Sequence, residues 1–158
     1  RSAFFKHYVQ TMSYIIEEMA MRALPTIVGG IKYMYKELSS GIKSSITRSI
    51  NTSIELYFAS IEWKEERFSM EDLVAYWQSY FQEHAAWYDK VSEDVRASEE
   101  FHTVLANKIN EGLSKMLNEA PTAEQVEAIN ALQKQHGTNF TFDCKAEAAF
   151  VEQTLKNM

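Results

Sequence analysis

Glu99 and His102 have the spacing of a metal-binding pair on a helix. Side chains three residues apart project from the same helical face, so the two could share one metal ion. A di-iron helical bundle, however, uses two Glu-x-x-His pairs together with carboxylates from facing helices. The chain holds no second pair. We therefore expect Glu99 to be a first-turn acid of a helix, and we expect no metal and no cofactor.

The other residues suited to acid–base or nucleophilic chemistry stand alone in the sequence. Cys144 is the only cysteine, and no histidine is identifiable as a base that would activate it. His84 falls on an aromatic helix face, where a lone histidine is more often a hydrogen-bonded core residue than a ligand. With no nucleophile and no acid–base set to assemble, we predict that the protein is not an enzyme.

A group of basic residues suits a different chemistry, the binding of anions. On an ideal helix Lys32, Lys36 and Lys43 fall within about 40° of one another, whereas Arg48 lies nearly opposite. This basic stripe of Lys32, Lys36 and Lys43 could hold a phosphate-bearing or acidic partner, or an anionic membrane surface. It could equally meet the acidic second half of the chain, or only water. We favour the last two, because exposed ion pairs contribute about 0–1 kcal/mol.

Hydroxyl side chains crowd the same stretch of sequence. Small side chains allow helices to approach closely, and Ser and Thr are mediocre helix formers because they compete for backbone hydrogen bonds. The favoured interpretation is a helix with a solvated Ser/Thr face, and the alternative is part of the anion site. The residues concerned are Ser39, Ser40, Ser44, Ser45, Thr47, Ser49, Thr52 and Ser53.

Aromatic residues gather between Leu73 and Val91. Large residues separated by steps of four, three, four, three and four form an a/d heptad seam on one side of a predicted helix. The seam consists of Leu73, Trp77, Tyr80, His84, Trp87 and Val91, and it is widened by Tyr76, Phe81 and Tyr88. The simplest interpretation is a hydrophobic core. Buried Tyr and Trp need partners for their polar atoms, however, so the seam could also line a pocket for an apolar small ligand or face another subunit.

The elements that position these residues are all predicted to be helical. Apolar residues at helical spacing predict helices over 3–24 and over 26–67, with the likeliest break in the second at Ser39, Ser40 and Gly41. A third helix begins after Ser69 and ends between Tyr88 and Asp94. A fourth, capped by Ser98, extends to about Asn118.

Pro121 separates the last part of the chain from these helices. Thr122 and Gln125 form a capping box, and Gly137 suits the residue that ends a helix. A final helix over 145–156 is expected to bury Ala146, Ala149, Phe150 and Val151. We therefore divide the chain into a helical bundle over 1–120 and a helix–loop–helix tail over 121–158, packed on the bundle or on a partner.

Composition and charge limit the classes of function that the protein can have. The 158 residues are 46% hydrophobic and 24% charged, as in a folded globular domain, and no apolar run is long enough to span a membrane. The chain has a net charge of −6. Residues 1–68 contain nine basic and seven acidic residues, a net charge of +2, so the remainder carries −8. An acidic second half disfavours nucleic acid as a partner. The single cysteine favours a reducing compartment, so we expect a cytoplasmic protein.

These patterns predict an all-α fold, a bundle of five or six helices, with globin-like packing as one variant. We expect a non-enzymatic regulatory or protein-interaction domain that self-associates or binds another protein. One alternative is a sensor domain with an apolar pocket lined by the aromatic seam. Another is a protein that binds anions or a membrane surface through the basic stripe.

Overall fold

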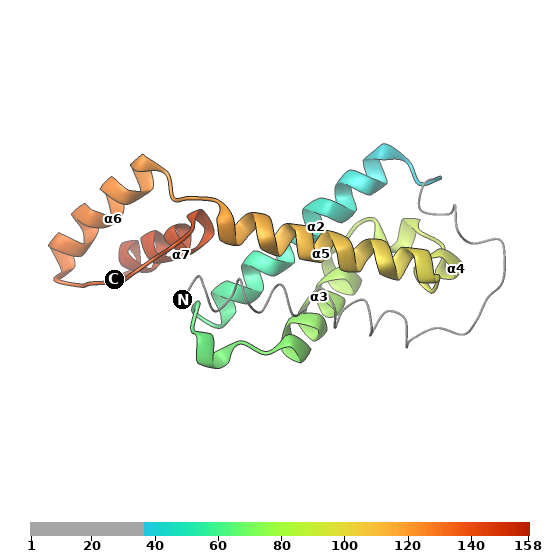
Figure 1. The fold of residues 1–158 in the computed structure, drawn as a ribbon, viewed down its shortest axis with the longest axis horizontal. Coiled ribbons are helices and arrows are strands. Elements are labelled where there is room, and N and C mark those ends of the chain that lie inside the picture. The colour runs from blue at the N-terminus through green and yellow to red at the C-terminus, as the bar shows by residue number, and fades with distance from the viewer. Residues whose placement is uncertain (1–36) are drawn as a thin grey trace.

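The computed structural model describes residues 37–158, apart from the side chains of Met70, Glu99 and His102, and this part of the chain consists of helices joined by loops, without strands (Figure 1). The all-α helical bundle is thus confirmed, and its globin-like variant stays a prediction. The α-helices are α2 (Ser40–Ser60), α3 (Met70–His84), α4 (Glu93–Arg96), α5 (Glu99–Asn118), α6 (Ala123–His136) and α7 (Lys145–Lys156), and the 3-10 helices are η1 (Glu65–Arg67) and η2 (Tyr88–Lys90).

Two predictions fall outside the described residues. They are the helix over 3–24 and the positions of Lys32 and Lys36 in the basic stripe. Within residues 37–158, no helix has both the length and the apolar character needed to cross a membrane.

Most of the described α-helices begin at hydroxyl residues, whereas α7 begins after Cys144. Each hydroxyl cap accepts a hydrogen bond from the backbone N–H three residues later, which satisfies a donor that the first helical turn leaves open. The caps are Ser39 of α2, Ser69 of α3, Ser98 of α5, and Thr122 of α6, whose capping box with Gln125 is complete. Gly137 ends α6 with a φ of 66°, a left-handed conformation that glycine adopts without strain. The caps at Ser69, Ser98 and Thr122 and the end at Gly137 confirm the sequence prediction, whereas Ser39 was predicted only as part of a helix break.

The predicted end of the second helix at Arg67 is wrong. Helix α2 ends at Ser60, because Glu62 and Trp63 both take a left-handed conformation with φ of 55°. The Trp63 N–H donates to the Phe58 carbonyl at 3.0 Å, and the two rings stack with centroids 4.7 Å apart. The turn therefore places the Trp63 side chain in the hydrophobic core.

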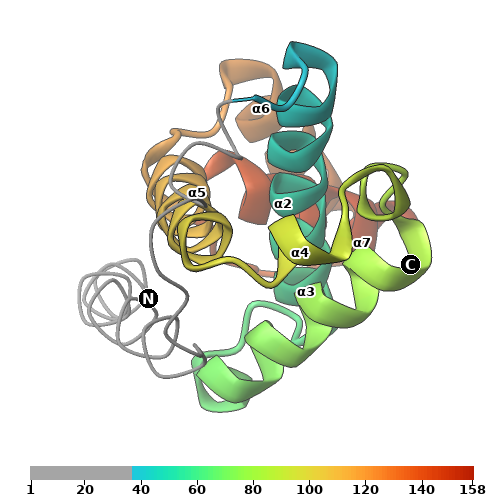
Figure 2. The ribbon, with the colours of Figure 1, turned by 90° about the vertical axis from the view of Figure 1, so that its right-hand side faces the viewer.

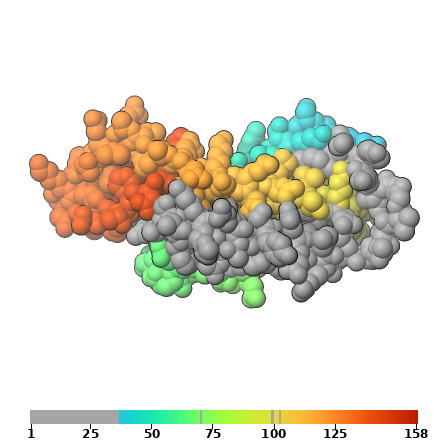
Figure 3. Space-filling view, in the orientation of Figure 1, coloured from blue at the N-terminus to red at the C-terminus, as the bar shows by residue number. Residues whose placement is uncertain are grey.

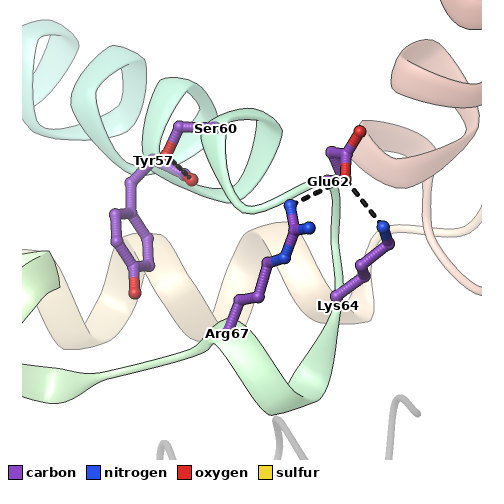
Figure 4. Close-up of polar contacts among 5 residues, drawn as sticks. All are labelled: Tyr57, Ser60, Glu62, Lys64 and Arg67. Atoms are coloured by element: carbon purple, nitrogen blue, oxygen red, sulfur yellow. Dashed lines mark hydrogen bonds and ion pairs between the residues drawn. The ribbon is translucent and has the colours of Figure 1, made fainter.

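Charged side chains form ion pairs on the exposed side of this turn. Glu62 accepts hydrogen bonds from Lys64 Nζ and Arg67 Nη1, each at 2.8 Å (Figure 4). The hydrogen bond and charge of Lys64, followed by the charge of Arg67, lower the pKa of the Glu62 carboxyl. The group is exposed, so solvent screens these ion pairs and they contribute little to stability.

The predicted end of the aromatic helix beyond Tyr88 is also wrong. Helix α3 ends at His84, and the extended residue Ala85 directs the chain into η2. Trp87 therefore does not continue the heptad seam along one helix. It enters the core from a turn, and its ring packs against Phe81 of α3 and Phe101 of α5.

Helix α2 lies at the centre of the described fold. It packs against α3 on one side and α5 on the other, and Figure 2 shows it standing between them. Its hydroxyl-rich sequence still presents a continuous apolar face made of Ile46, Ile50, Ile54, Tyr57 and Phe58, all at most 2% exposed. The Tyr57 hydroxyl also donates to the Ser69 carbonyl at 3.1 Å and accepts from its N–H at 3.0 Å. This pair of bonds fixes the start of α3 to α2.

Helices α6 and α7 pack mainly on each other around a small second core. Ala148, Val151 and Leu155 of α7 are buried there, whereas Ala149, which we expected to be buried, is exposed. The reason is that the buried stripe follows steps of three and four from Ala148. Phe150 packs against both cores, and the two helices form one end of the molecule in Figure 3. The division into domains over 1–120 and 121–158 stays a prediction.

Candidate functional site

The residues of the aromatic seam are distributed between the core and its edge. Phe81 and Trp87 are buried at 2% and 1% exposure. The half-buried members that pack against this core are Tyr76, Trp77, Tyr80 and Tyr88. The prediction that His84 is a core residue is wrong, because its side chain is exposed. Its ring lies 5.3 Å from that of Tyr80, and its Nε2 is 3.7 Å from a Glu83 carboxylate oxygen.

Buried hydroxyl groups replace part of the solvated face that we expected on α2. Ser49 and Ser53 are buried, and each donates to a carbonyl one turn earlier in the helix. Ser49 Oγ also accepts a hydrogen bond of 2.7 Å from the indole Nε1 of Trp87. The buried tryptophan thus has the polar partner that it requires. The solvated-face prediction is wrong at these two positions.

Helices α2 and α5 approach each other closely at Gly112 of α5. A Cβ atom on Gly112 would lie 2.8 Å from Asn51 Oδ1 and 3.4 Å from Ile54 Cδ1 of α2. Both helices run in the same general direction in Figure 1 and cross at an angle. Two crossed rods diverge on either side of their contact point. Each side of this crossing accordingly holds a groove.

The first groove, here called the interhelical groove, lies where the C-terminal half of α2 faces α5 and α7. It has a volume of about 640 Å³, and Trp63 is among the residues that line it. Its apolar lining includes Leu56 and Ala59 of α2, Met116 of α5, and Ala149 and Phe150 of α7. Its charged lining is Glu55, Lys115, Glu119 and Lys145.

Leu56 is the feature that distinguishes this groove from an ordinary crevice. Its side chain is 43% exposed, although it lies one residue from the buried Tyr57. A large apolar side chain at the edge of an apolar groove is typical of a surface that another molecule covers. Lys145 Nζ lies 3.3 Å from a Glu119 carboxylate oxygen, so one pair of opposite charges already meets within the lining.

The second groove, here called the basic shelf, lies on the other side of the crossing. It is a shallow hollow of about 420 Å³ lined by Lys43, Ser44, Thr47, Arg48 and Asn51 of α2 and Lys108 of α5. The basic shelf contains Lys43 of the predicted basic stripe. It also contains Arg48, which we expected nearly opposite the stripe on an ideal helix. Neither groove is lined by the aromatic seam.

The remaining candidates for chemistry do not assemble into a site. Within the described part of the chain, no group of three or more His, Cys, Asp and Glu side chains is placed to hold a metal ion. Cys144 is 2% exposed. Burial, together with the nearby Glu147 carboxylate, raises the pKa of its thiol and works against a nucleophilic thiolate.

Comparison with known proteins gives no relative. No family model, no curated protein and no solved structure matches the chain significantly. The function must therefore be argued from the geometry of the molecule.

Several residues of the basic shelf were named from the sequence, among them Lys43, Thr47 and Arg48, but Lys108, Gly112 and Leu56 were not identified. Lys108 is one of two lysines in the amphipathic helix α5, and nothing local connects it to residues 43–51. Gly112 did carry a usable signal, because a glycine inside a strong helical pattern often marks a close approach of two elements. The apolar residues Ile46, Ile50 and Ile54 repeat every four residues, and Leu56 lies outside this repeat, so its position could have identified it as exposed.

Proposed function

We propose that this protein is a non-enzymatic helical interaction domain that self-associates, with a second copy of the chain covering the interhelical groove. The observation that carries the proposal is the exposed Leu56 at the edge of a groove lined by Met116 and Phe150. Covering this surface would remove apolar area from water, which is the main driving force for association.

The charges around the groove favour a second copy over an unrelated partner. In a twofold symmetric dimer the same patch meets itself, so a patch that contains charged groups is self-complementary only when it carries both signs. The groove contains two acids, Glu55 and Glu119, and two bases, Lys115 and Lys145. A strongly acidic patch would repel its copy, and the chain as a whole has a net charge of −6. The balanced lining is the arrangement that a self-contact requires.

Leu56→Glu tests the groove directly. The substitution places a carboxylate next to Glu55 and in the middle of the proposed contact, where an unpaired charge is costly. We expect association to weaken at least about tenfold, measured by size-exclusion chromatography with light scattering over a range of protein concentrations. Because Leu56 is already 43% exposed, the helical fold of the subunit should persist, as circular dichroism can check.

Phe140→Glu is the matched control. Phe140 is 41% exposed, nearly the same as Leu56, but it lies in the loop between α6 and α7 and does not line the groove. This variant should associate like the wild type. Equal weakening by both substitutions, or no change with Leu56→Glu, would show that the groove is not the contact surface.

A further inference from the structure

The basic shelf concentrates positive charge on an acidic protein. Among the described residues, its lining contributes three cations, Lys43, Arg48 and Lys108, and no carboxylate. The chain as a whole carries a net charge of −6. An anion bound on this surface would be attracted to all three positive charges.

Side chains from two helices converge on the shelf. Lys108 Nζ of α5 lies 3.4 Å from the Thr47 hydroxyl of α2. That hydroxyl donates to the Lys43 carbonyl at 3.2 Å, which holds Thr47 in place one turn after Lys43. Thr47, Lys43 and Lys108 are all half-buried. The ammonium of Lys108 is therefore directed toward the lysine and hydroxyl groups of α2.

The donors of the shelf match a phosphate group better than a carboxylate. A phosphate monoester carries a charge of about −1.5 to −2 near pH 7 and presents three strong acceptor oxygens. The guanidinium of Arg48 offers paired donors suited to phosphate, and lysine ammonium groups bind it as point charges. The Ser44 hydroxyl and the Asn51 amide add neutral donors at the rim.

We propose that the basic shelf is a binding site for a phosphate group, held by Lys43, Arg48 and Lys108. The phosphate can belong to a free anion or to a phospholipid headgroup at a membrane surface, since both present the same chemistry. The shelf lies on the opposite side of the α2–α5 crossing from the interhelical groove. Phosphate binding therefore does not depend on self-association.

Binding of inorganic phosphate to the full chain, measured by isothermal titration calorimetry, is the first arm of the test. The wild type should bind phosphate saturably, and added salt should weaken the binding. Lys108→Gln should weaken it about tenfold, the loss expected for one charge-assisted hydrogen bond. Arg48→Gln, on the exposed side of the shelf, provides a second variant that leaves the α2–α5 contact intact.

Sedimentation with vesicles is the second arm. Vesicles of phosphatidylcholine with phosphatidic acid would be compared with vesicles of phosphatidylcholine alone. Binding that requires phosphatidic acid and is lost in Lys108→Gln identifies the lipid headgroup as the source of the phosphate. Binding of inorganic phosphate with no vesicle binding identifies a free anion.

Lys134→Gln in α6 is the control, because it removes the same charge from an exposed position away from the shelf. It should bind phosphate and vesicles like the wild type. The proposal is overturned if the wild type binds neither probe. It is also overturned if Lys108→Gln binds as well as the wild type, or if Lys134→Gln is weakened equally. All three variants should keep the subunit number of the wild type, so failure here is distinct from failure of the groove contact.

Discussion

Among individual side chains, the buried hydrogen bond between Trp87 and Ser49 accounts for two differences from the sequence prediction. These are the burial of Ser49 and the position of Trp87 in a turn after α3. The bond gives the indole N–H an acceptor at 2.7 Å, and it holds the turn after α3 against the middle of α2. The hydroxyl that seemed to belong to a solvated face is a structural partner of the core. Ser49 is 8% exposed, so water has little access to replace this contact.

Ser49→Ala should measure the importance of that bond. Removal of the hydroxyl leaves a buried indole donor without its partner, which typically costs about 1–3 kcal/mol. We expect the free energy of unfolding in urea, followed by tryptophan fluorescence, to fall by that amount. Ser44→Ala changes an exposed serine of the same helix and should have little effect. Equal stability of the two variants would contradict the role assigned to Ser49.

Cys144 should behave as a protected thiol. It is 2% exposed at the start of α7, and it is the only cysteine in the chain. Alkylation by iodoacetamide should therefore be slow in the folded protein and fast in urea. Leu56→Cys supplies an exposed thiol in the same molecule for comparison. Rapid labelling of wild-type Cys144 without denaturant would contradict its burial.

The thiol of Cys144 also predicts a pH dependence of stability. Burial raises its pKa in the folded protein above the ordinary value of 9.0. As pH rises, the unfolded chain loses this proton first, so the contribution is constant below about pH 9 and is lost above it, through the folded pKa. The loss is at most about 1.4 kcal/mol for each pH unit. Urea unfolding between pH 8 and 10 should show a shallower decline in Cys144→Ala than in the wild type.

Among the helices, the α2–α5 crossing determines the shape of the surface. Gly112 allows the close approach, and the divergence of the two helices on either side produces the interhelical groove and the basic shelf. Asn51 lies at the boundary and lines both. A change in the crossing should therefore alter both grooves together.

Gly112→Ala and Gly112→Val should differ in their effects. Alanine gains about 1 kcal/mol of helix propensity, while its Cβ displaces Asn51 Oδ1, the end of an exposed and flexible side chain. We expect a net change in unfolding free energy below about 1 kcal/mol. Valine adds atoms toward Ile54 in the packed contact and should destabilise the protein by about 1–3 kcal/mol.

Gly41→Val is the control for these measurements. Its nearest neighbouring atom beyond the helix backbone would be Ser39 Oγ at 3.9 Å, so the larger side chain has space. This variant should remain as stable as the wild type. If Gly112→Val were equally harmless, the two helices would not approach closely at Gly112.

The starts of the helices were predictable from sequence because caps are local. Ser69, Ser98 and Thr122 each bond a backbone N–H three residues away. The ends of α2 and α3 were not predictable in the same way. The heptad spacing through Trp87 is satisfied both by a continuous helix and by a helix followed by a turn. The choice between them depends on a partner, Ser49, that lies 38 residues away.

Across the whole molecule, the candidate surfaces follow from how distant segments meet. The sequence identified Lys43 as part of a basic group, but it could not place Lys108 beside Thr47, 61 residues away. Likewise, the aromatic seam drew attention because its residues are large. The structure places Phe81 and Trp87 in the core and leaves a different surface, around Leu56, accessible to a partner.

Sedimentation equilibrium of the 158-residue chain tests the central claim most directly. Each subunit has a mass of 18.2 kDa. At micromolar concentration and moderate salt, the account predicts a monomer–dimer equilibrium with a dimer of twice that mass, shifted toward monomer by Leu56→Glu but not by Phe140→Glu. A single species of 18.2 kDa at every concentration would contradict the proposal that a second copy covers the groove between α2, α5 and α7.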